Sequence, residues 1–483
     1  QQLGGPVTKP IFPRLRLAMC VCAAVATTAL TLAGCQSGQP HPYAPGSMSE
    51  TRSLAPSPAI RVALASRLTK DGIIDQAEYE GQDEFEDFKD SPVKLTAREP
   101  VSTFAVDVDT SSYAFVRRKL QQGVLPQKDA VRAEEMINYF DYAYPVPASR
   151  EAPFKPTIAV TDSPWALGRQ LIHIGIKGYD IEPAQRPRAN LVFLLDVSGS
   201  MNAPDKLPLL VQSMKMLVDE SLDSEDTVAI VVYASATGVV LEPTPAREKS
   251  KIIAALDQLE AGGSTSGGEG IRQAYALAAQ NFDPKAVNRV ILATDGDFNV
   301  GITNRQELKG FVEREREKGI FLSVLGFGQG NYHDALMQDL AQNGNGVAAY
   351  IDTRAEARKV LVNEAAASLF PIAKDVKMQV EFNPARVAEW RLIGYETRAL
   401  AEEDFANDKV DAGDIGSGHT VTAMYEITPA GSEARMLPAR RYAANAAPSV
   451  EGADSGELGF VRIRYKLPDA DTSRLIEAPI AAD

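Results

Sequence analysis

The chain has 483 residues, of which 45% are hydrophobic and 24% are charged, and its formal net charge is −14 at pH 7. Single hydrophobic cores stop growing near roughly 250–300 residues, so this length predicts about two to four domains and excludes a single core. The composition is ordinary for a folded protein and excludes bulk disorder. The acidic balance argues against nucleic acid as the main partner, because polyanion binding depends on clustered Lys and Arg side chains.

The amino-terminal segment has the pattern of a secretory signal. A short basic stretch precedes residues 17–33, which are almost entirely apolar or small, and the run ends in the letters Leu-Ala-Gly-Cys at Cys35. A transmembrane helix needs about 20 apolar residues, whereas this run is shorter and no basic cluster follows it. The pattern therefore predicts a signal peptide over residues 1–35, with an uncleaved signal anchor as the alternative.

The end of this segment resembles the lipobox of bacterial lipoproteins. The resemblance implies that the sulfur of Cys35 is acylated and that this cysteine becomes the first residue of the mature chain. It also implies a lipid anchor in the cell envelope of a Gram-negative-type bacterium. By the same resemblance, Gln36 after the cysteine favours the outer membrane.

The residues before position 188 divide into two expected segments. Residues 36–95 are rich in Pro, Ser, Gly and acidic side chains. Such a composition buries too little apolar surface to offset chain entropy, so it predicts a flexible tether. Residues 96–187 combine alternating apolar positions with helix-like stretches over 113–120 and 130–140. They predict a small N-terminal unit of mixed α and β structure.

A different pattern runs through residues 188–370. Short runs that are apolar on both faces alternate with amphipathic helical patterns, which requires a mainly parallel sheet covered by helices on both faces. The apolar runs lie at residues 191–195, 228–233, 290–293 and 320–325. We therefore predict an open, doubly wound α/β domain whose ligand site lies at the carboxyl ends of the strands.

Alternation returns after this domain. Residues 371–483 carry apolar side chains at every second position in several stretches, so they predict a C-terminal β-rich region. Strand-like segments also precede the α/β domain. We therefore hypothesise that the two flanks pair into one sandwich, with the α/β domain inserted between them.

Polar residues follow the apolar runs at the edge where this fold binds ligands. Asp196, Ser198 and Ser200 follow the first run, Thr265 lies in a glycine-rich loop, and Asp295 follows the third run. These carboxylates and hydroxyls are hard oxygen donors, a set that suits Mg²⁺, Mn²⁺ or Ca²⁺ and disfavours Zn²⁺. Because only the two aspartates are charged, the ion stays electrophilic and keeps an open position for an outside oxygen.

The same five residues resemble the metal-ion-dependent adhesion site of von Willebrand factor type A domains. The resemblance covers about 180 residues of the α/β domain. It implies that the two serines and, with ligand bound, the threonine contact the metal directly, while the aspartates bind it directly or through water. A ligand Asp or Glu then completes the coordination shell.

The flanking regions resemble those of bacterial YfbK-type lipoproteins. This similarity rests on residues 100–118 and 131–140 and on the region after Phe370, and family members tend to continue past the position of Asp483. Together the resemblances imply a membrane-anchored module that binds a protein ligand through a metal ion. They imply neither catalysis nor a small-molecule substrate. We further expect Asp196→Ala or Asp295→Ala to abolish metal binding while leaving the fold intact.

Two other functions stay open. In the first, the chain is an envelope structural or assembly factor whose metal site is vestigial and whose β flanks make the contacts. In the second, Asp107 and Asp109 act as the Asp-x-Asp nucleophile motif of haloacid-dehalogenase-type phosphatases. Against the phosphatase, residue 111 is Ser rather than Thr or Val and no second catalytic motif follows, so a turn at the end of a strand is the favoured interpretation.

Overall fold

The computed structural model describes residues 83–106, 109–147, 149–264, 268–296, 304–410, 412–438 and 456–482. The expected signal peptide with Cys35 and most of the expected tether lie outside these residues, as do Asp107 and Thr265. Within the described ranges, no helix is both long enough and apolar enough to cross a membrane.

A six-stranded sheet forms the centre of the α/β domain, with the order β10-β9-β8-β5-β6-β7. All neighbours pair in parallel except β6 and β7, which are antiparallel at the edge. Every residue of β5 and β8 is buried, which explains why they read as continuous apolar runs. The strands are β5 (Ala189–Asp196), β6 (Thr227–Tyr233), β7 (Thr237–Pro245), β8 (Val287–Thr294), β9 (Ile320–Phe327) and β10 (Ala348–Ile351).

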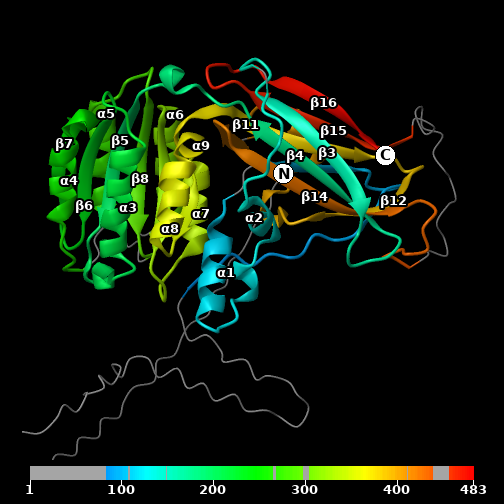
Figure 1. The fold of residues 1–483 in the computed structure, drawn as a ribbon, viewed down its shortest axis with the longest axis horizontal. Coiled ribbons are helices and arrows are strands. Elements are labelled where there is room, and N and C mark those ends of the chain that lie inside the picture. The colour runs from blue at the N-terminus through cyan, green and yellow to red at the C-terminus, as the bar shows by residue number, and fades with distance from the viewer. Residues whose placement is uncertain are drawn as a thin grey trace, which may run out of the picture. The chain divides into compact units, whose positions relative to one another are not determined.

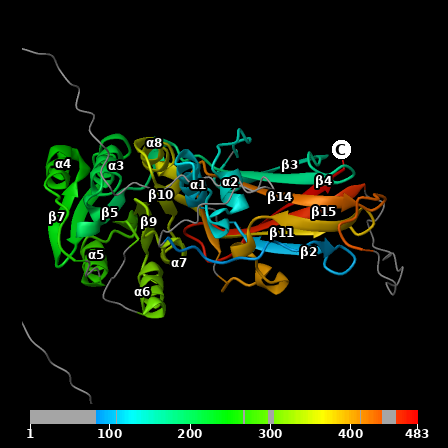
Figure 2. The ribbon, with the colours of Figure 1, turned by 90° about the horizontal axis from the view of Figure 1, so that it is seen from below.

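Helices cover both faces of this sheet, and each face has its own apolar core (Figure 2). One face packs against α3 (Leu207–Glu220), α4 (Lys249–Asp257), α8 (Arg354–Arg358), a π-helical segment (Lys359–Asn363) and α9 (Ala365–Leu369). The other packs against α1 (Ser111–Gln121), α5 (Gly268–Gln280), α6 (Arg305–Glu317) and α7 (Asp334–Asn343). The predicted doubly wound, mainly parallel fold is therefore confirmed.

Two further sheets share a single apolar core and form a sandwich. One has the order β1-β12-β14-β4-β3, and the other has β13-β11-β15-β16 with β2 beside β11. The strands before the α/β domain are β1 (Lys94–Leu95), β2 (Val101–Ala105), β3 (Phe154–Asp162) and β4 (Gln170–Gly178). Those after it are β11 (Pro371–Phe382), β12 (Val387–Ile393), β13 (Gly413–Gly416), β14 (Thr420–Pro429), β15 (Glu457–Lys466) and β16 (Arg474–Ala481).

Segments from the two flanks lie side by side in both sheets (Figure 1). Strand β4 pairs with β14, so that Ile174 lies opposite Ala423, and β2 pairs with β11, so that Phe104 lies opposite Met378. The hypothesis that the flanks form one sandwich around an inserted α/β domain is therefore confirmed.

The expected boundary of the tether at residue 95 is wrong. Within the described range 83–95, the carboxylate of Asp83 accepts hydrogen bonds from the backbone N–H groups of Gly330 at 2.8 Å and Tyr332 at 2.9 Å. Phe85 packs edge-on against Phe115 with ring centroids 4.8 Å apart. The acidic composition of this segment suggested a tether that makes no contacts. The carboxylate of Asp83 is instead hydrogen-bonded by backbone N–H groups of a loop that is distant in the sequence.

Residues 96–187 contain the mixed α and β structure that the sequence predicts, and they contribute to both parts of the fold. Helix α1 contributes Ala114 and Phe115 to one core of the α/β domain, whereas strands β2, β3 and β4 belong to the sandwich. The short helix α2 (Ala133–Asn138) lies between the two parts, and the Asn138 side chain donates to the backbone oxygen of Thr422 in β14 at 3.0 Å. This region therefore joins the two parts instead of folding around a core of its own.

Candidate functional site

The ends of β5 and β8 bring two carboxylates to one edge of the central sheet. These strands are parallel neighbours, and Leu195 lies opposite Ala293 in their register. The next positions place Asp196 and Asp295 at the same carboxyl edge. Both side chains are buried, because Asp196 is 0% exposed and Asp295 is 1% exposed. This is the edge at which the sequence predicted a ligand site.

Asp196 is held by hydrogen bonds on both oxygens. Its Oδ1 accepts from the backbone N–H of Ser198 at 2.9 Å, and its Oδ2 accepts from the hydroxyls of Thr294 at 3.1 Å and Tyr233 at 3.3 Å. Burial raises the pKa of Asp196 to about 6, and the nearby charge of Asp295 acts in the same direction, while the hydrogen bonds from Ser198 and Thr294 oppose both. The hydrogen bonds therefore fix the orientation of the carboxylate. Keeping this buried group ionised without a positive neighbour costs free energy.

Two hydroxyls lie next to this carboxylate. The Oγ atoms of Ser198 and Ser200 are 3.0 Å apart, with Ser198 buried and Ser200 exposed to solvent. The glycine-rich loop is tied to the same turn, because Gly199 donates its backbone N–H to the oxygen of Gly263 at 2.9 Å. Thr265 follows in that loop but lies outside the described residues.

Asp295 accepts a strong ion-pair hydrogen bond from Lys206, which the sequence analysis did not identify. The distance from Lys206 Nζ to Asp295 Oδ2 is 2.7 Å, and the two side chains are 13% and 0% exposed. Lys206 is the residue that immediately precedes α3. A lysine at a helix N-terminus is disfavoured by the helix dipole, and no local pattern in the sequence pointed to Asp295 as its partner.

The residues present fit a hard divalent cation. The described members of the predicted set, Asp196, Ser198, Ser200 and Asp295, offer only oxygen donors, as Mg²⁺, Mn²⁺ and Ca²⁺ require. The ammonium of Lys206 at Asp295 shows that this edge already accommodates a positive charge. Across the described residues, no group of three or more His, Cys, Asp or Glu side chains is arranged to hold a metal, so a site here depends on hydroxyl donors as well as on carboxylates.

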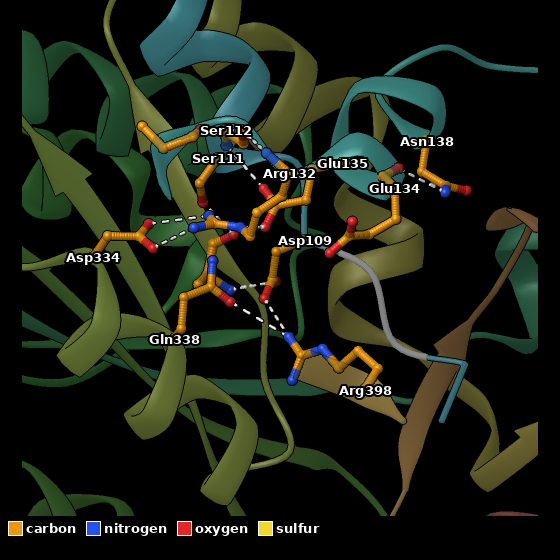
Figure 3. A network of polar contacts seen from close by, with 12 residues as sticks. Asp109, Ser111, Ser112, Arg132, Glu134, Glu135, Asn138, Asp334, Gln338 and Arg398 are labelled. Carbon is orange, nitrogen blue, oxygen red and sulfur yellow. Dashed lines mark hydrogen bonds and ion pairs between the residues drawn. The ribbon is translucent and has the colours of Figure 1, made fainter. Parts of the chain in front are cut away.

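Asp109, one half of the alternative phosphatase motif, belongs to a buried polar network (Figure 3). Its Oδ1 accepts from the backbone N–H of Ala348 at 2.9 Å, and its Oδ2 accepts from Arg398 at 3.3 Å. It therefore bonds to β10 of the α/β domain and to a residue that follows β12 of the sandwich. Its partner Asp107 lies outside the described residues. A carboxylate engaged in this way is a structural anchor rather than an exposed nucleophile, which weakens the phosphatase hypothesis.

The same network contains an arginine held between carboxylates. Arg132 donates to Asp334 Oδ2 at 2.7 Å and also pairs with Glu135, and all three side chains are at most 7% exposed. Asp334 lies in α7 of the α/β domain. Arg132 immediately precedes α2, and Glu135 lies within α2. The network therefore fixes α2 against the α/β domain.

Three family models match the chain. One described as von Willebrand factor type A domain matches residues 190–364, and one described as von Willebrand factor matches residues 79–173. One described as the C-terminal part of the uncharacterized protein YfbK matches residues 367–483.

The chain is also similar to other proteins and to solved structures. The chain is 44% identical over 409 residues to the uncharacterized protein YfbK of Escherichia coli (strain K12), covering 83% of this chain and 70% of that protein. It is 27% identical over 182 residues to the inter-alpha-trypsin inhibitor heavy chain H2 of Homo sapiens, and this match covers 35% of this chain and 19% of that protein. A solved von Willebrand factor type A structure from Catenulispora acidiphila superposes with a TM-score of 0.41 at 16% identity, covering 68% of this chain and 74% of that one.

Proposed function

The chain belongs to the YfbK family and contains a von Willebrand factor type A domain, and from this premise we propose that it binds a protein ligand through a divalent metal ion. Ser198, Ser200 and Thr265 coordinate the ion, while Asp196 and Asp295 hold it and its waters. The metal is Mg²⁺, with Mn²⁺ or Ca²⁺ as alternatives. When bound, it supplies an electrophilic position at which an Asp or Glu of the partner protein completes the shell.

One observation carries this proposal. Asp196, Ser198 and Ser200 at the end of β5 and Asp295 at the end of β8 gather their oxygens at one edge of the sheet. A cluster that served only to cap a helix needs one such side chain and not the whole set. The buried hydrogen bonds of Asp196 fix its carboxylate, so the free energy of ordering it does not weaken ion binding.

We propose that this module acts at the bacterial cell envelope and without catalysis of its own. Acylation of Cys35 anchors the chain to the membrane, with the outer membrane favoured, and the segment that follows the cysteine lifts the folded part off the lipid surface. A ligand carboxylate contacting the ion contributes a few kcal/mol of the binding free energy, about that of a charge-assisted contact. The proposal includes no nucleic acid and no small-molecule substrate.

A second candidate function is structural assembly with a vestigial metal site. The Lys206–Asp295 ion pair favours it, since a lysine that neutralises the carboxylate makes a metal ion dispensable for folding. The sandwich then makes the partner contacts. Between β3 and β4, Trp165 is 58% exposed and Leu167 is 98% exposed, so this turn offers apolar side chains to a partner.

Chelation separates the two functions. Native envelope proteins are captured on the immobilised chain in Mg²⁺ or in EDTA, with Ser200→Ala as the site variant and Ser221→Ala, at the end of α3, as the matched control. Metal-dependent binding predicts partners that are lost in EDTA and with Ser200→Ala but kept with Ser221→Ala. Partners that persist in EDTA and disappear with Leu167→Ser support assembly through the sandwich and contradict the metal-dependent function.

A further inference from the structure

Lys206 is restrained on two sides by its neighbours. Its aliphatic stem lies against Gly328, because a Cβ at that position would lie 2.4 Å from the Cε and 2.6 Å from the Cγ of the lysine. Asp205, the residue before it in the chain, forms an ion pair with Arg118. The stem of Lys206 and the backbone that precedes it are therefore both held, while its ammonium donates to Asp295 at 2.7 Å.

Arg118 contacts both sides of this arrangement. Its Nη2 pairs with Asp205, and its Nη1 donates to the hydroxyl of Tyr350 at 3.0 Å. That hydroxyl in turn donates to the backbone oxygen of Gly328. One guanidinium thus fixes the segment before α3 and, through a tyrosine, the segment after β9, and Lys206 lies between these two segments. The planar guanidinium suits such a bridge because its several donors point in fixed directions.

The bridging arginine comes from the region that precedes the α/β domain. It lies in α1, which runs alongside β10, the edge strand of the central sheet (Figure 2). The side chain of Arg118 is only 13% exposed, so its ion pair is partly shielded from water. The neighbouring Arg117 pairs with Asp352 after β10 and donates to the hydroxyl of Tyr139 at 2.8 Å. Helix α1 is therefore anchored by contacts that do not involve Arg118.

We propose that Arg118 is a positioning residue of the metal site: it holds Lys206 on Asp295 and so sets how readily a divalent cation gains that carboxylate. The inference rests on the proposed function, because it concerns the same site. An unrestrained lysine side chain loses rotamer freedom when it pairs with a carboxylate. The restraint on Lys206 removes part of this cost in advance, which strengthens the pair and makes its replacement by a metal ion harder.

Two variants weaken the restraint without changing the net charge. Arg118→Lys keeps the positive charge but loses the forked geometry that joins Asp205 to Tyr350. Tyr350→Phe removes the hydroxyl that links Arg118 to Gly328. The matched control is Tyr275→Phe, since the buried hydroxyl of Tyr275 has no hydrogen-bond partner among the described residues. Because no charge is lost in any of the three, a change in metal affinity does not arise from the loss of a nearby cation.

Titration calorimetry with Mn²⁺ on the full chain gives the first readout. We expect Arg118→Lys and Tyr350→Phe to raise the Mn²⁺ affinity about threefold, because the lysine becomes free to leave Asp295. Tyr275→Phe should leave the affinity unchanged. In a Lys206→Met background both variants should have no effect, because the residue through which they act is gone. An affinity that falls, stays constant, or changes equally in both backgrounds overturns the proposal.

The second readout needs no metal. Low doses of acetic anhydride acetylate accessible lysines, and mass spectrometry of the folded, metal-free protein measures the rate at each one. We expect both variants to raise the rate at Lys206 and to leave it unchanged at Lys215 in α3. Absence of Mn²⁺ binding by every protein contradicts the proposed function. An unchanged acetylation rate at Lys206 contradicts the role of Arg118, so the two failures are distinguishable.

Discussion

Lys206 directs its ammonium into the predicted metal site and donates to Asp295 Oδ2 at 2.7 Å. Gly328, with φ at +75°, leaves space for this side chain, because a Cβ at that position would lie 2.4 Å from Lys206 Cε. The lysine and a divalent cation therefore require the same carboxylate. In the metal-bound protein Lys206 has to share or release Asp295.

Replacing Lys206 tests this competition. We expect Lys206→Met to raise the affinity for Mg²⁺ or Mn²⁺ by about tenfold, because removal of a partly desolvated charge pair frees a carboxylate and removes a repulsive cation. Calorimetric titration of the metal measures the change. Lys215→Met in α3, whose partner Asp257 is remote from the site, is the control. An affinity that is unchanged by Lys206→Met means that the lysine does not compete with the ion.

Gly328→Ala tests the packing beneath the lysine. The substitution forces a Cβ into Lys206 and strains a positive φ, so we expect a loss of about 1–3 kcal/mol of unfolding free energy, measured in urea. Gly330→Ala is a matched control, because its φ is +94° but no atom lies within 4 Å of an added Cβ. In Gly330→Ala, only the backbone strain from the positive φ should lower the free energy of unfolding. If both variants lose equal stability, the lysine is not packed on Gly328 as described.

Much of the α/β domain was predictable from sequence, because strands buried on both faces and amphipathic helices leave unambiguous periodicities. The metal-site residues Asp196 and Asp295 were identified for the same reason, since their strands end where the apolar runs end. Lys206 was missed because it lies 89 residues from its partner, a separation that no local pattern encodes.

The sandwich was harder to predict in detail. Strand β16 is largely exposed at the edge of its sheet, so it has little apolar alternation to detect. Strand β12 contains Glu389, which is fully buried because it accepts backbone hydrogen bonds from Met436 and Leu437. Hydrogen bonds from residues distant in the sequence also hold Asp83, in a segment whose composition predicted a tether.

The expectation that Asp196→Ala leaves the fold intact needs correction. Asp196 is fully buried and accepts from Ser198, Tyr233 and Thr294, so removing it leaves several buried donors without an acceptor. The isosteric Asp196→Asn keeps most of these bonds and is the better test of metal binding. We expect Asp196→Ala to lower the free energy of unfolding by about 1–3 kcal/mol, and Asp196→Asn by less.

Arg132→Met tests the junction between α2 and the α/β domain. It leaves Asp334 and Glu135 buried without their cation, which costs about 3–5 kcal/mol of unfolding free energy in typical cases. Urea denaturation measures the loss. The control is Arg358→Met, which breaks an ion pair with Glu220 whose side chains are 49% and 37% exposed, because such a surface pair contributes little to stability. Similar small losses in both proteins contradict a stabilising junction.

Glu134 makes the stability of the junction depend on pH. Burial, and then the charge of Glu135, raise the pKa of Glu134 above its ordinary 4.5. The folded state therefore favours the protonated form of Glu134. This preference contributes fully to the free energy of unfolding below the pKa that Glu134 has in the unfolded chain. The contribution is lost as pH rises through the pKa that Glu134 has in the folded chain. We expect Glu134→Gln to match wild type in acid and to exceed it at neutral pH, in unfolding midpoints followed across pH. A constant difference at every pH contradicts this account.

The central claim is that Asp196, Ser198, Ser200, Thr265 and Asp295 together hold a divalent ion, and a direct titration with Mn²⁺, followed by electron paramagnetic resonance, tests it. The account predicts saturable binding by wild type and its loss in Asp196→Asn, with circular dichroism showing both proteins folded. Failure of wild type to bind Mn²⁺, or equal binding by the folded variant, would contradict it.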